Sequence, residues 1–414
     1  MNPGHEPDLA RELLSLCIAP ACTGEPSPPS ASSGVARDWD ALIRLAIEQG
    51  VAPLLAVRTR NLRLPVAFRE RLESIYSSNS IRNLRLAAEE SRISAALAAA
   101  GLRHWPLKGP GLSERLYADI GVRQVADLDL LVEPASLART DALLADLGYA
   151  RQTSGPIDSL SAAQELIYMR DSTPSAPWSR PRSVDGVSGS PSSTASASLD
   201  TRHSPLATAF YLDLHQRLLP YVRRDPLARR VFASGMTKEN LLLYLCANQI
   251  THRFARLRYL CDVAAFLERE GASVEWDVFL SAARRLPWGP GVGFALDWAV
   301  TFASSSVPPR VLHALRPSPI GDLILRRSLG AGAAEAASRS RLLDGPAGAG
   351  VSLGSAYLGR PAACGIAWRM MFPPRAYIRE QTGAPAGDPL LPAYATRLMR
   401  KIPAALRQLL KATP

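Results

Sequence analysis

Residues 107–149 read LKGPGLSERLYADIGVRQVADLDLLVEPASLARTDALLADLGY, and their pattern alternates between two kinds of secondary structure. Residues 127–132 (DLDLLV) place two acids and three apolar side chains on opposite sides at the period of a β-strand. Apolar residues recur at helical spacing in residues 110–117 and 135–148. Further short apolar runs flank them: LRHWPL before, YARQ and AFYLDLH after. This alternation predicts a small α/β sheet between Gly101 and Leu218.

Long helical patterns lie on both sides of this mixed segment. Residues 39–60 and 80–100 before it, and residues 238–270 and 276–285 after it, carry apolar side chains on a helical period. We therefore expect an N-terminal helical cap, a mixed core and a C-terminal helical domain. Their expected bounds are residues 1–100, 101–235 and 236–414.

One long segment departs from globular composition. Of the 30 residues from Ser172 to Thr201, ten are Ser, four are Pro, three are Thr and two are Gly. Such a segment has too few large apolar side chains to offset the entropy lost on ordering. We expect a disordered insertion over about 171–205 that carries no chemistry.

The overall composition is globular and basic. The 414 residues are 47% hydrophobic and carry a formal net charge of +11, but only four of the 48 cations are lysines, which suggests a coding bias. Because aromatic and basic residues do not alternate along any stretch, a nucleic-acid partner is not indicated. The basic amphipathic stretch 392–411 suits an anionic membrane surface or an acidic partner, although packing on the helical domain is the favoured interpretation.

The cysteine pattern and the N-terminus bear on location. The five cysteines form no CxxC pair and no zinc-spaced cluster, which favours a reducing compartment. Two acids precede any apolar run at the N-terminus, and no run of 18 apolar residues occurs. We expect a cytoplasmic protein without a membrane span.

The run Leu107-Lys108-Gly109-Pro110-Gly111 joins a predicted strand to a predicted helix. Glycine lets a backbone approach a ligand closely, and the first N–H groups of a helix attract anions such as phosphate. The same run is equally consistent with a turn that only permits tight packing.

Asp127 and Asp129 point to the same side of their predicted strand, where their charges repel. A hard cation such as Mg²⁺ would neutralise this pair. An isolated Asp-x-Asp is also typical of a strand end that faces solvent. A third acid, Asp213, lies in the predicted strand FYLDLH. About 35 of the residues between Asp127 and Asp213 belong to the expected insertion, so their separation within the folded core is short. Three acids on neighbouring strands predict a two-metal site, in which one carboxylate can also help to deprotonate the attacking hydroxyl.

Several further polar residues allow two interpretations. His215 shares a face with Asp213 and either orients it or is a buried histidine with a structural role. Asn248, His252 and Arg256 form a stripe at helical spacing that faces either the cleft or, as we favour, solvent. Asp262 lies in an apolar helical pattern, and Arg258 one turn earlier is its expected partner.

Residues 107–149 resemble the signature of the uncharacterised bacterial nucleotidyltransferase family, within the polymerase-beta-like nucleotidyltransferase superfamily. That signature combines a Lys-Gly turn, a helix ending in Leu-Tyr, an Arg shortly before Asp-x-Asp, and a helix ending in Leu-Gly-Tyr. Further similarity lies in LDLHQRL, in LLYLCANQITHRFARLRYLCDVAAFL and in MMFPPRAYIRE. The resemblance covers most of the chain except its two Ser/Pro-rich stretches, Thr23–Gly34 and Ser172–Thr201.

The resemblance implies an α+β fold, in which a minimal nucleotidyltransferase mixed β-sheet core is flanked by N-terminal and C-terminal helical regions. It implies metal-dependent transfer of a nucleotide from an NTP, with Mg²⁺ or Mn²⁺, to an acceptor that the sequence does not identify. Asp127, Asp129 and Asp213 are then the catalytic metal ligands. Lys108, Gly109 and Arg123 are the expected phosphate-binding residues, and His215 would support the ligands.

Three positions depart from the pattern of the family and its superfamily: Gly109-Pro110 replaces a Gly-Ser turn, Ala126 replaces a Ser, and Asn248 stands where a His is usual. The altered turn keeps a second hypothesis open, a catalytically silent nucleotide-binding or assembly module of the same fold. A glycosyltransferase that uses Asp-x-Asp is disfavoured, because a helical cap rather than a large nucleotide-binding sheet precedes the motif.

Overall fold

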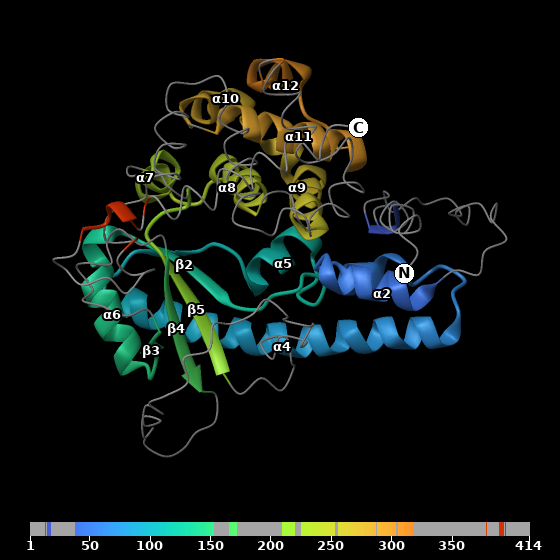
Figure 1. The fold of residues 1–414 in the computed structure, drawn as a ribbon, viewed down its shortest axis with the longest axis horizontal. Helices are drawn as coiled ribbons and strands as arrows, with labels where there is room; N and C mark the ends of the chain where they lie inside the picture. Colours follow the sequence, from blue (N-terminus) through green and yellow to red (C-terminus); the bar gives the residue numbers. More distant parts are fainter. Residues whose placement is uncertain are drawn as a thin grey trace.

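The computed structural model of the chain describes residues 13, 15–17, 38–152, 165–171, 209–219, 225–252, 256–286, 288–303, 305–317, 319, 378, 389–392 and 394. Within these residues the protein is an α+β fold with a five-stranded mixed sheet, as expected. Long helices cover the sheet on one side, and a helical bundle lies on the other (Figure 1).

The sheet has the strand order β1-β2-β5-β4-β3. Its strands are β1 (His104–Pro106), β2 (Leu128–Val132), β3 (Ala150–Arg151), β4 (Glu165–Asp171) and β5 (Ala209–His215). β2 pairs in parallel with β5, and every other pairing is antiparallel. The sequence patterns predicted β1, β2, β3 and β5 but missed β4, which lies just before the Ser/Pro-rich segment.

Strand β2 is buried on both of its faces. Leu128, Leu130 and Val132 are fully buried in one apolar cluster, as their alternation predicted, whereas Leu131 joins the other main cluster. A strand covered on both sides forms a rigid support, so the position of Asp129 between these residues is well defined.

The first apolar cluster fills the space between the sheet and two helices. Helix α4 (Val66–Ala99) contributes Leu86, Ile93 and Leu97, and helix α6 (Leu137–Asp146) contributes Leu137 and Leu144. Both helices therefore cover the face of the sheet that carries Leu128 and Leu130, and the helical bundle lies on the opposite side of the sheet (Figure 1).

The second apolar cluster joins helices from both ends of the described chain. Its helices include α2 (Trp39–Glu48), α3 (Ala52–Arg58), α5 (Pro110–Tyr117), α7 (Pro226–Ser234), α8 (Lys238–Thr251), α9 (Leu257–Glu270), α10 (Trp276–Arg285), α11 (Gly289–Ala303) and α12 (Pro309–Leu315). The beginning of α4 adds Phe68 and Leu72, and β2 adds Leu131. The predicted helical pattern 39–60 is two helices, because Gly50 takes a positive φ of 71° between them. Residues 238–270 form two helices, α8 and α9.

Some expectations remain untested by this structure. The insertion 171–205 lies outside the described residues except for Asp171, which ends β4, and the basic stretch 392–411 lies outside them except for residues 392 and 394. The division into three parts stays a prediction. In the described part of the chain, no helix combines the length and hydropathy that a membrane crossing requires.

Candidate functional site

The register of the two parallel strands brings two acids side by side. Asp129 on β2 stands directly opposite Asp213 on β5, and Leu131 stands opposite His215. Alternate side chains of a strand share a face, so His215 and Asp213 point to the same side. Ligand atoms of Asp129, Asp213 and His215 all lie within 4.8 Å of one another. These three residues form a group that can hold a metal ion.

Asp129 is firmly anchored in this group. It is 2% exposed, and its Oδ1 lies 2.8 Å from Nε2 of His215 and 3.1 Å from Nζ of Lys108. Burial alone would raise the pKa of this carboxyl, but the charge of Lys108 and the hydrogen bond with His215 outweigh it and hold the pKa well below its usual range. Asp129 therefore stays ionised. In turn, the charge of Asp129 overcomes the burial of Lys108 and raises the pKa of its amine, so Lys108 stays protonated.

Asp127 lies at the edge of this group, just before β2 begins. Its carboxyl lines the same cleft as Asp129 but is not part of the group within 4.8 Å. Burial and the negative charge of Asp129 raise the pKa of Asp127. Asp127 and Asp129 thus line the same cleft, and the acid that joins Asp129 in the group within 4.8 Å is Asp213.

The Lys-Gly turn follows β1 and starts helix α5. Gly109 has φ 106° and ψ −164°, a conformation that is essentially restricted to glycine, and it occupies the N-cap of α5. A Cβ at Gly109 would approach Oε2 of Glu90 to 3.0 Å. Within the described residues this Oε2 is buried and has no hydrogen-bond partner, and burial together with the charge of Asp129 raises the pKa of Glu90 to about 7. The carboxyl of Glu90 therefore packs against Gly109 in this turn, a role that the sequence did not reveal.

Arg123 lines the cleft but is already engaged in an ion pair. Its Nε donates to both oxygens of Asp262, at 3.2 and 3.0 Å, and Arg123 and Asp262 are 5% and 1% exposed. Tyr117 also donates to Asp262, at 3.0 Å. The prediction that Arg258 pairs with Asp262 is wrong. Asp262 faces helix α5, and Arg258 instead donates to the Gln124 carbonyl and the Tyr259 hydroxyl. Any contact of Arg123 with phosphate has to use its remaining nitrogens.

Helix α8 forms part of the wall of the same cleft. Tyr244, Asn248, Thr251 and His252 line the cleft at helical spacing, and Arg258 joins them from α9. The favoured interpretation of a solvated face is wrong for Asn248 and His252, since Asn248 is 7% exposed and His252 lines the cleft. The stripe extends back to Tyr244 rather than forward to Arg256, because α8 ends at Thr251 and Arg256 is exposed. Helical spacing alone could have found Tyr244.

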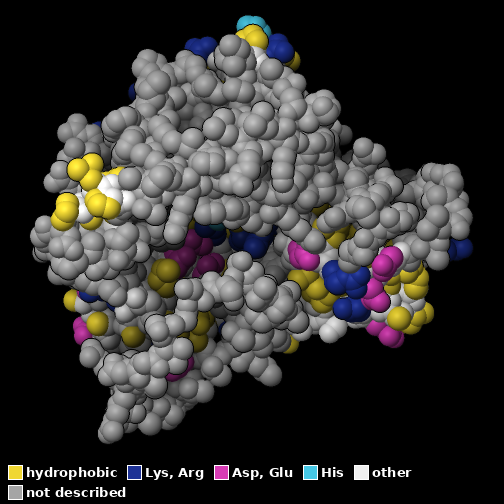
Figure 2. All heavy atoms as spheres, in the orientation of Figure 1, with side chains coloured by type: hydrophobic (Ala, Val, Ile, Leu, Met, Phe, Trp, Pro, Cys, Tyr) yellow, Lys and Arg dark blue, Asp and Glu magenta, His cyan; other side chains and the backbone are white. Residues whose placement is uncertain are grey.

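The acids, the Lys-Gly turn, Arg123 and the polar residues of α8 line one cleft of about 360 Å³. Figure 2 shows acidic and basic side chains together at the bottom of a hollow in the molecular surface. The cleft brings together Lys108, Gly109, Arg123, Asp127, Asp129, Asp213 and His215, the whole set of site residues expected from the sequence. Its volume falls in the range of small-molecule sites.

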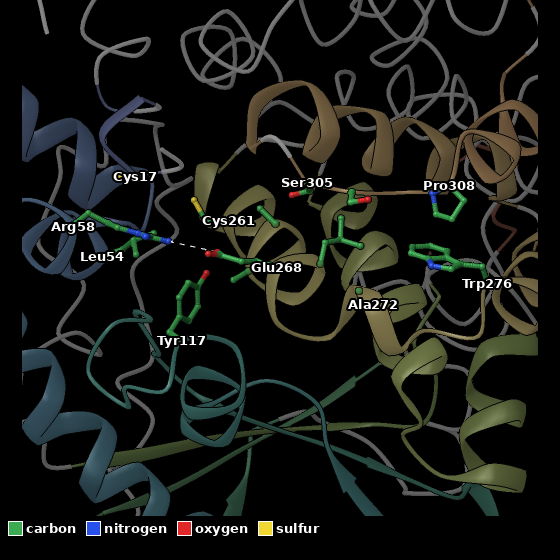
Figure 3. A pocket seen from close by; sticks show the side chains of 15 residues that line it. Cys17, Leu54, Arg58, Tyr117, Cys261, Glu268, Ala272, Trp276, Ser305 and Pro308 are labelled. Atoms are coloured by element: carbon green, nitrogen blue, oxygen red, sulfur yellow. Dashed lines mark ion pairs between the residues drawn. The ribbon is translucent and has the colours of Figure 1, made fainter. Parts of the chain in front are cut away.

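A larger cavity of about 440 Å³ lies farther along α9 (Figure 3). Its lining is mostly apolar and includes Trp276 and the free thiols of Cys17 and Cys261. Burial raises the pKa of the Cys17 thiol to about 12, so this thiol stays protonated and unreactive. The charged side chains in its lining are Arg58 and Glu268, a loose pair at 3.9 Å. Among the described residues, the acid cluster that could hold a metal ion therefore lies in the smaller cleft and not in this cavity.

Comparison with known families gives one match. The family described as "Uncharacterised nucleotidyltransferase" matches residues 36–304, which include α2 to α11 and the entire sheet. Comparisons with curated proteins and with solved structures found no match.

Proposed function

Since the chain belongs to the uncharacterised nucleotidyltransferase family, we propose that it transfers a nucleotide from an NTP to a hydroxyl group of an acceptor, with Mg²⁺ or Mn²⁺ as cofactor. The observation that carries this proposal is the cross-strand pair of Asp129 and Asp213, which lies beside Lys108 in a cleft of ligand size.

The donor set of the cleft fits a divalent cation. Carboxylates suit the hard ions Mg²⁺ and Mn²⁺, and a neutral imidazole also suits Mn²⁺. Asp129 and Asp213 would hold the ion, and Asp127 adds a further carboxylate on the same side of the cleft. When bound, such an ion offsets the charge that develops on the phosphate oxygens.

The cations of the cleft suit the phosphates of an NTP. Lys108 is charged and 19% of its side chain is exposed, so its amine can reach a ligand while it stays next to Asp129. Gly109 lets the backbone approach the phosphate, and the first N–H groups of α5 favour an anion. Arg123 adds positive charge at the cleft wall and is held in place by Asp262.

The transfer needs a group that takes up a proton and a group that leaves. The hydroxyl oxygen of the acceptor molecule forms a bond with the α-phosphorus of the NTP. The bond from this phosphorus to the oxygen that bridges it to the β-phosphorus breaks, and pyrophosphate leaves. Asp213 lies less deeply buried than Asp129 and is our candidate for the carboxylate that takes the proton of the attacking hydroxyl.

A labelling experiment tests this function. Purified protein is incubated with Mg²⁺, a cell extract as the source of acceptor, and NTPs labelled either at the α- or at the γ-phosphate. We expect transfer of the α-label only, with a loss of at least about 100-fold in Asp129→Asn and Asp213→Asn. Transfer of the γ-label instead would identify a kinase and contradict the proposal.

Asp146→Asn provides the matched control, because this carboxylate is exposed on α6 and lies outside the cleft. It should transfer label like the wild type. If the wild type binds NTP but transfers nothing to any fraction of the extract, the silent nucleotide-binding module is the better description.

A further inference from the structure

The end of helix α8 carries a polar side chain that no other described residue engages. Asn248 is 7% exposed and lines the cleft, and its carboxamide makes no hydrogen bond with any residue in the described part of the chain. The carboxamide of Asn240 on the same helix is used fully: it donates to the Gly235 carbonyl and the Ser234 hydroxyl, and accepts from Arg230. Because buried polar groups are normally paired, a free amide in a cleft points to a ligand.

One turn later, His252 presents an aromatic ring to the same cleft. Its ring stacks on that of Tyr259, with a centroid distance of 4.5 Å and an interplanar angle of 10°. Tyr259 is 3% exposed and covers one face of the imidazole. The rest of the His252 ring therefore lines the cleft. Burial and the nearby charges of Lys108 and Arg258 lower the pKa of His252 to about 3. The ring is thus neutral at pH 7 and suits a flat, uncharged partner rather than a phosphate.

We infer that Asn248 and His252 form the subsite for the nucleobase of the NTP, an inference that rests on the proposed function. A carboxamide offers a donor and an acceptor side by side, which is the pattern that pairs with the edge of a nucleobase. The stacked imidazole offers a surface for the face of the base, because every base has a π-face. The phosphates are then left to Lys108, which lines the same cleft beside Asp129.

Equilibrium binding separates this role from the alternatives. The full chain is titrated with ATP, GTP, CTP and UTP, and with tripolyphosphate, which carries the phosphates without a base. In Asn248→Ala and in His252→Ala we expect the preferred NTP to bind about 10-fold more weakly, as for the loss of one hydrogen bond or one stacking contact. Tripolyphosphate should bind as in the wild type, and in Asn248→Ala the four NTPs should differ less from one another.

The matched control is Asn240→Ala, on the same helix and outside the cleft. It should lower the melting temperature, because it leaves Gly235 and Arg230 without their partner, yet keep NTP affinity. Asn248→Ala should show the opposite pattern, since it removes an amide without described partners and places a good helix former in α8.

Two results would overturn the inference. An equal weakening of tripolyphosphate would assign Asn248 and His252 to the phosphates. Unchanged NTP affinity in both variants would remove the base subsite, and a raised KM for the acceptor would then assign this wall to the acceptor. A folded wild type that binds no NTP at all would instead contradict the proposed function itself.

Discussion

The carboxyl oxygen Oδ1 of Asp129 is the point on which the site converges. It is held between Nζ of Lys108 and Nε2 of His215, so its charge is balanced inside a buried environment. An unbalanced carboxylate in this position would take up a proton instead. The paired cation and imidazole therefore make an ionised ligand available at neutral pH, where the transfer is proposed to take place.

The backbone conformation of Gly109, also a property of a single residue, leads to a specific prediction. Gly109→Ala should lower the free energy of unfolding by about 1–3 kcal/mol, because φ 106° is strained for any residue with a Cβ. The new methyl group would also press on Glu90 behind the turn. Urea denaturation measures this loss.

Gly101→Ala is the control for this change. Gly101 also has a positive φ, of 67°, but a Cβ there meets nothing within 4 Å, and this φ belongs to the left-handed region that other residues visit. If Gly109→Ala lowers the free energy of unfolding no more than Gly101→Ala does, then neither the contact with Glu90 nor the conformation of Gly109 contributes to stability.

Glu90 makes a prediction about pH. Its pKa is raised from 4.5 to about 7 by burial and by Asp129, so the folded protein keeps this proton over a pH range where the unfolded chain has lost it. The stability contributed by this group is present at low pH and falls as pH rises between about 4.5 and 7. Glu90→Gln should therefore gain stability over the wild type by about 1–2 kcal/mol between pH 5 and pH 8, a value reduced for the partial exposure of the carboxyl.

Urea denaturation at both pH values checks the Glu90 prediction. Glu70→Gln, at an exposed position of the same helix, controls for a Glu-to-Gln change on α4. A gain for Glu90→Gln that is equal at pH 5 and pH 8 would mean that the side chain acts through its shape and not through its charge.

Among the elements, the connection between β5 and α7 holds the strand of Asp213 against the helical bundle. Asp225, the N-cap of α7, accepts four backbone hydrogen bonds. Oδ1 accepts from Leu227 and Ala228 at the start of the helix, and Oδ2 accepts from Leu218 and Leu219 just after β5. One carboxylate thus joins the end of the strand segment to the beginning of the helix.

Asp225→Ala should therefore cost more than the loss of an ordinary helix cap. We expect a decrease of about 2–4 kcal/mol in the free energy of unfolding, because four buried N–H groups lose their acceptor. Thr237→Ala is the comparison, since Thr237 caps α8 through a single bond to the N–H of Asn240, and it should cost about 1 kcal/mol. Equal costs in urea denaturation would argue against the link between β5 and α7.

For the whole molecule, the buried pair of Arg123 and Asp262 connects the segment before β2 to the helical bundle. Arg123 is held from the other side by α4, since its carbonyl accepts from Asn79 and Asn83 at 3.0 and 2.9 Å. The chain between α5 and β2 is therefore fixed by contacts with both layers, and these contacts define one wall of the cleft.

Asp262→Ala should lower the free energy of unfolding by about 3–5 kcal/mol, because it leaves the guanidinium of Arg123 buried without its counter-ion. The double variant Arg123→Met/Asp262→Leu should recover much of this loss, since neither charge remains buried. Chemical denaturation of the single and double variants measures the coupling. A double variant as unstable as Asp262→Ala would show that the pair does not act as a unit.

The sequence by itself determined the local structure that makes the site possible. The period-2 alternation in residues 127–132 and 209–215 predicted the strands that carry Asp129 and Asp213, and the Lys108-Gly109 run predicted the turn into α5. These features could be predicted because strand alternation and a glycine φ depend on neighbours in the chain. The resemblance of residues 107–149 to a known family predicted the sheet core and the membership that the family match confirms.

Only the tertiary structure decided which of these local features meet. Parallel pairing places Asp213 opposite Asp129, and the packing of α8 brings Asn248 and His252 to the cleft, whereas α8 ends before Arg256. The partner of Asp262 is likewise set by the helix packed against it and not by the residue one turn away. Strand order, helix ends and the partner of a buried charge depend on how distant segments pack together, and that information is absent from any local pattern.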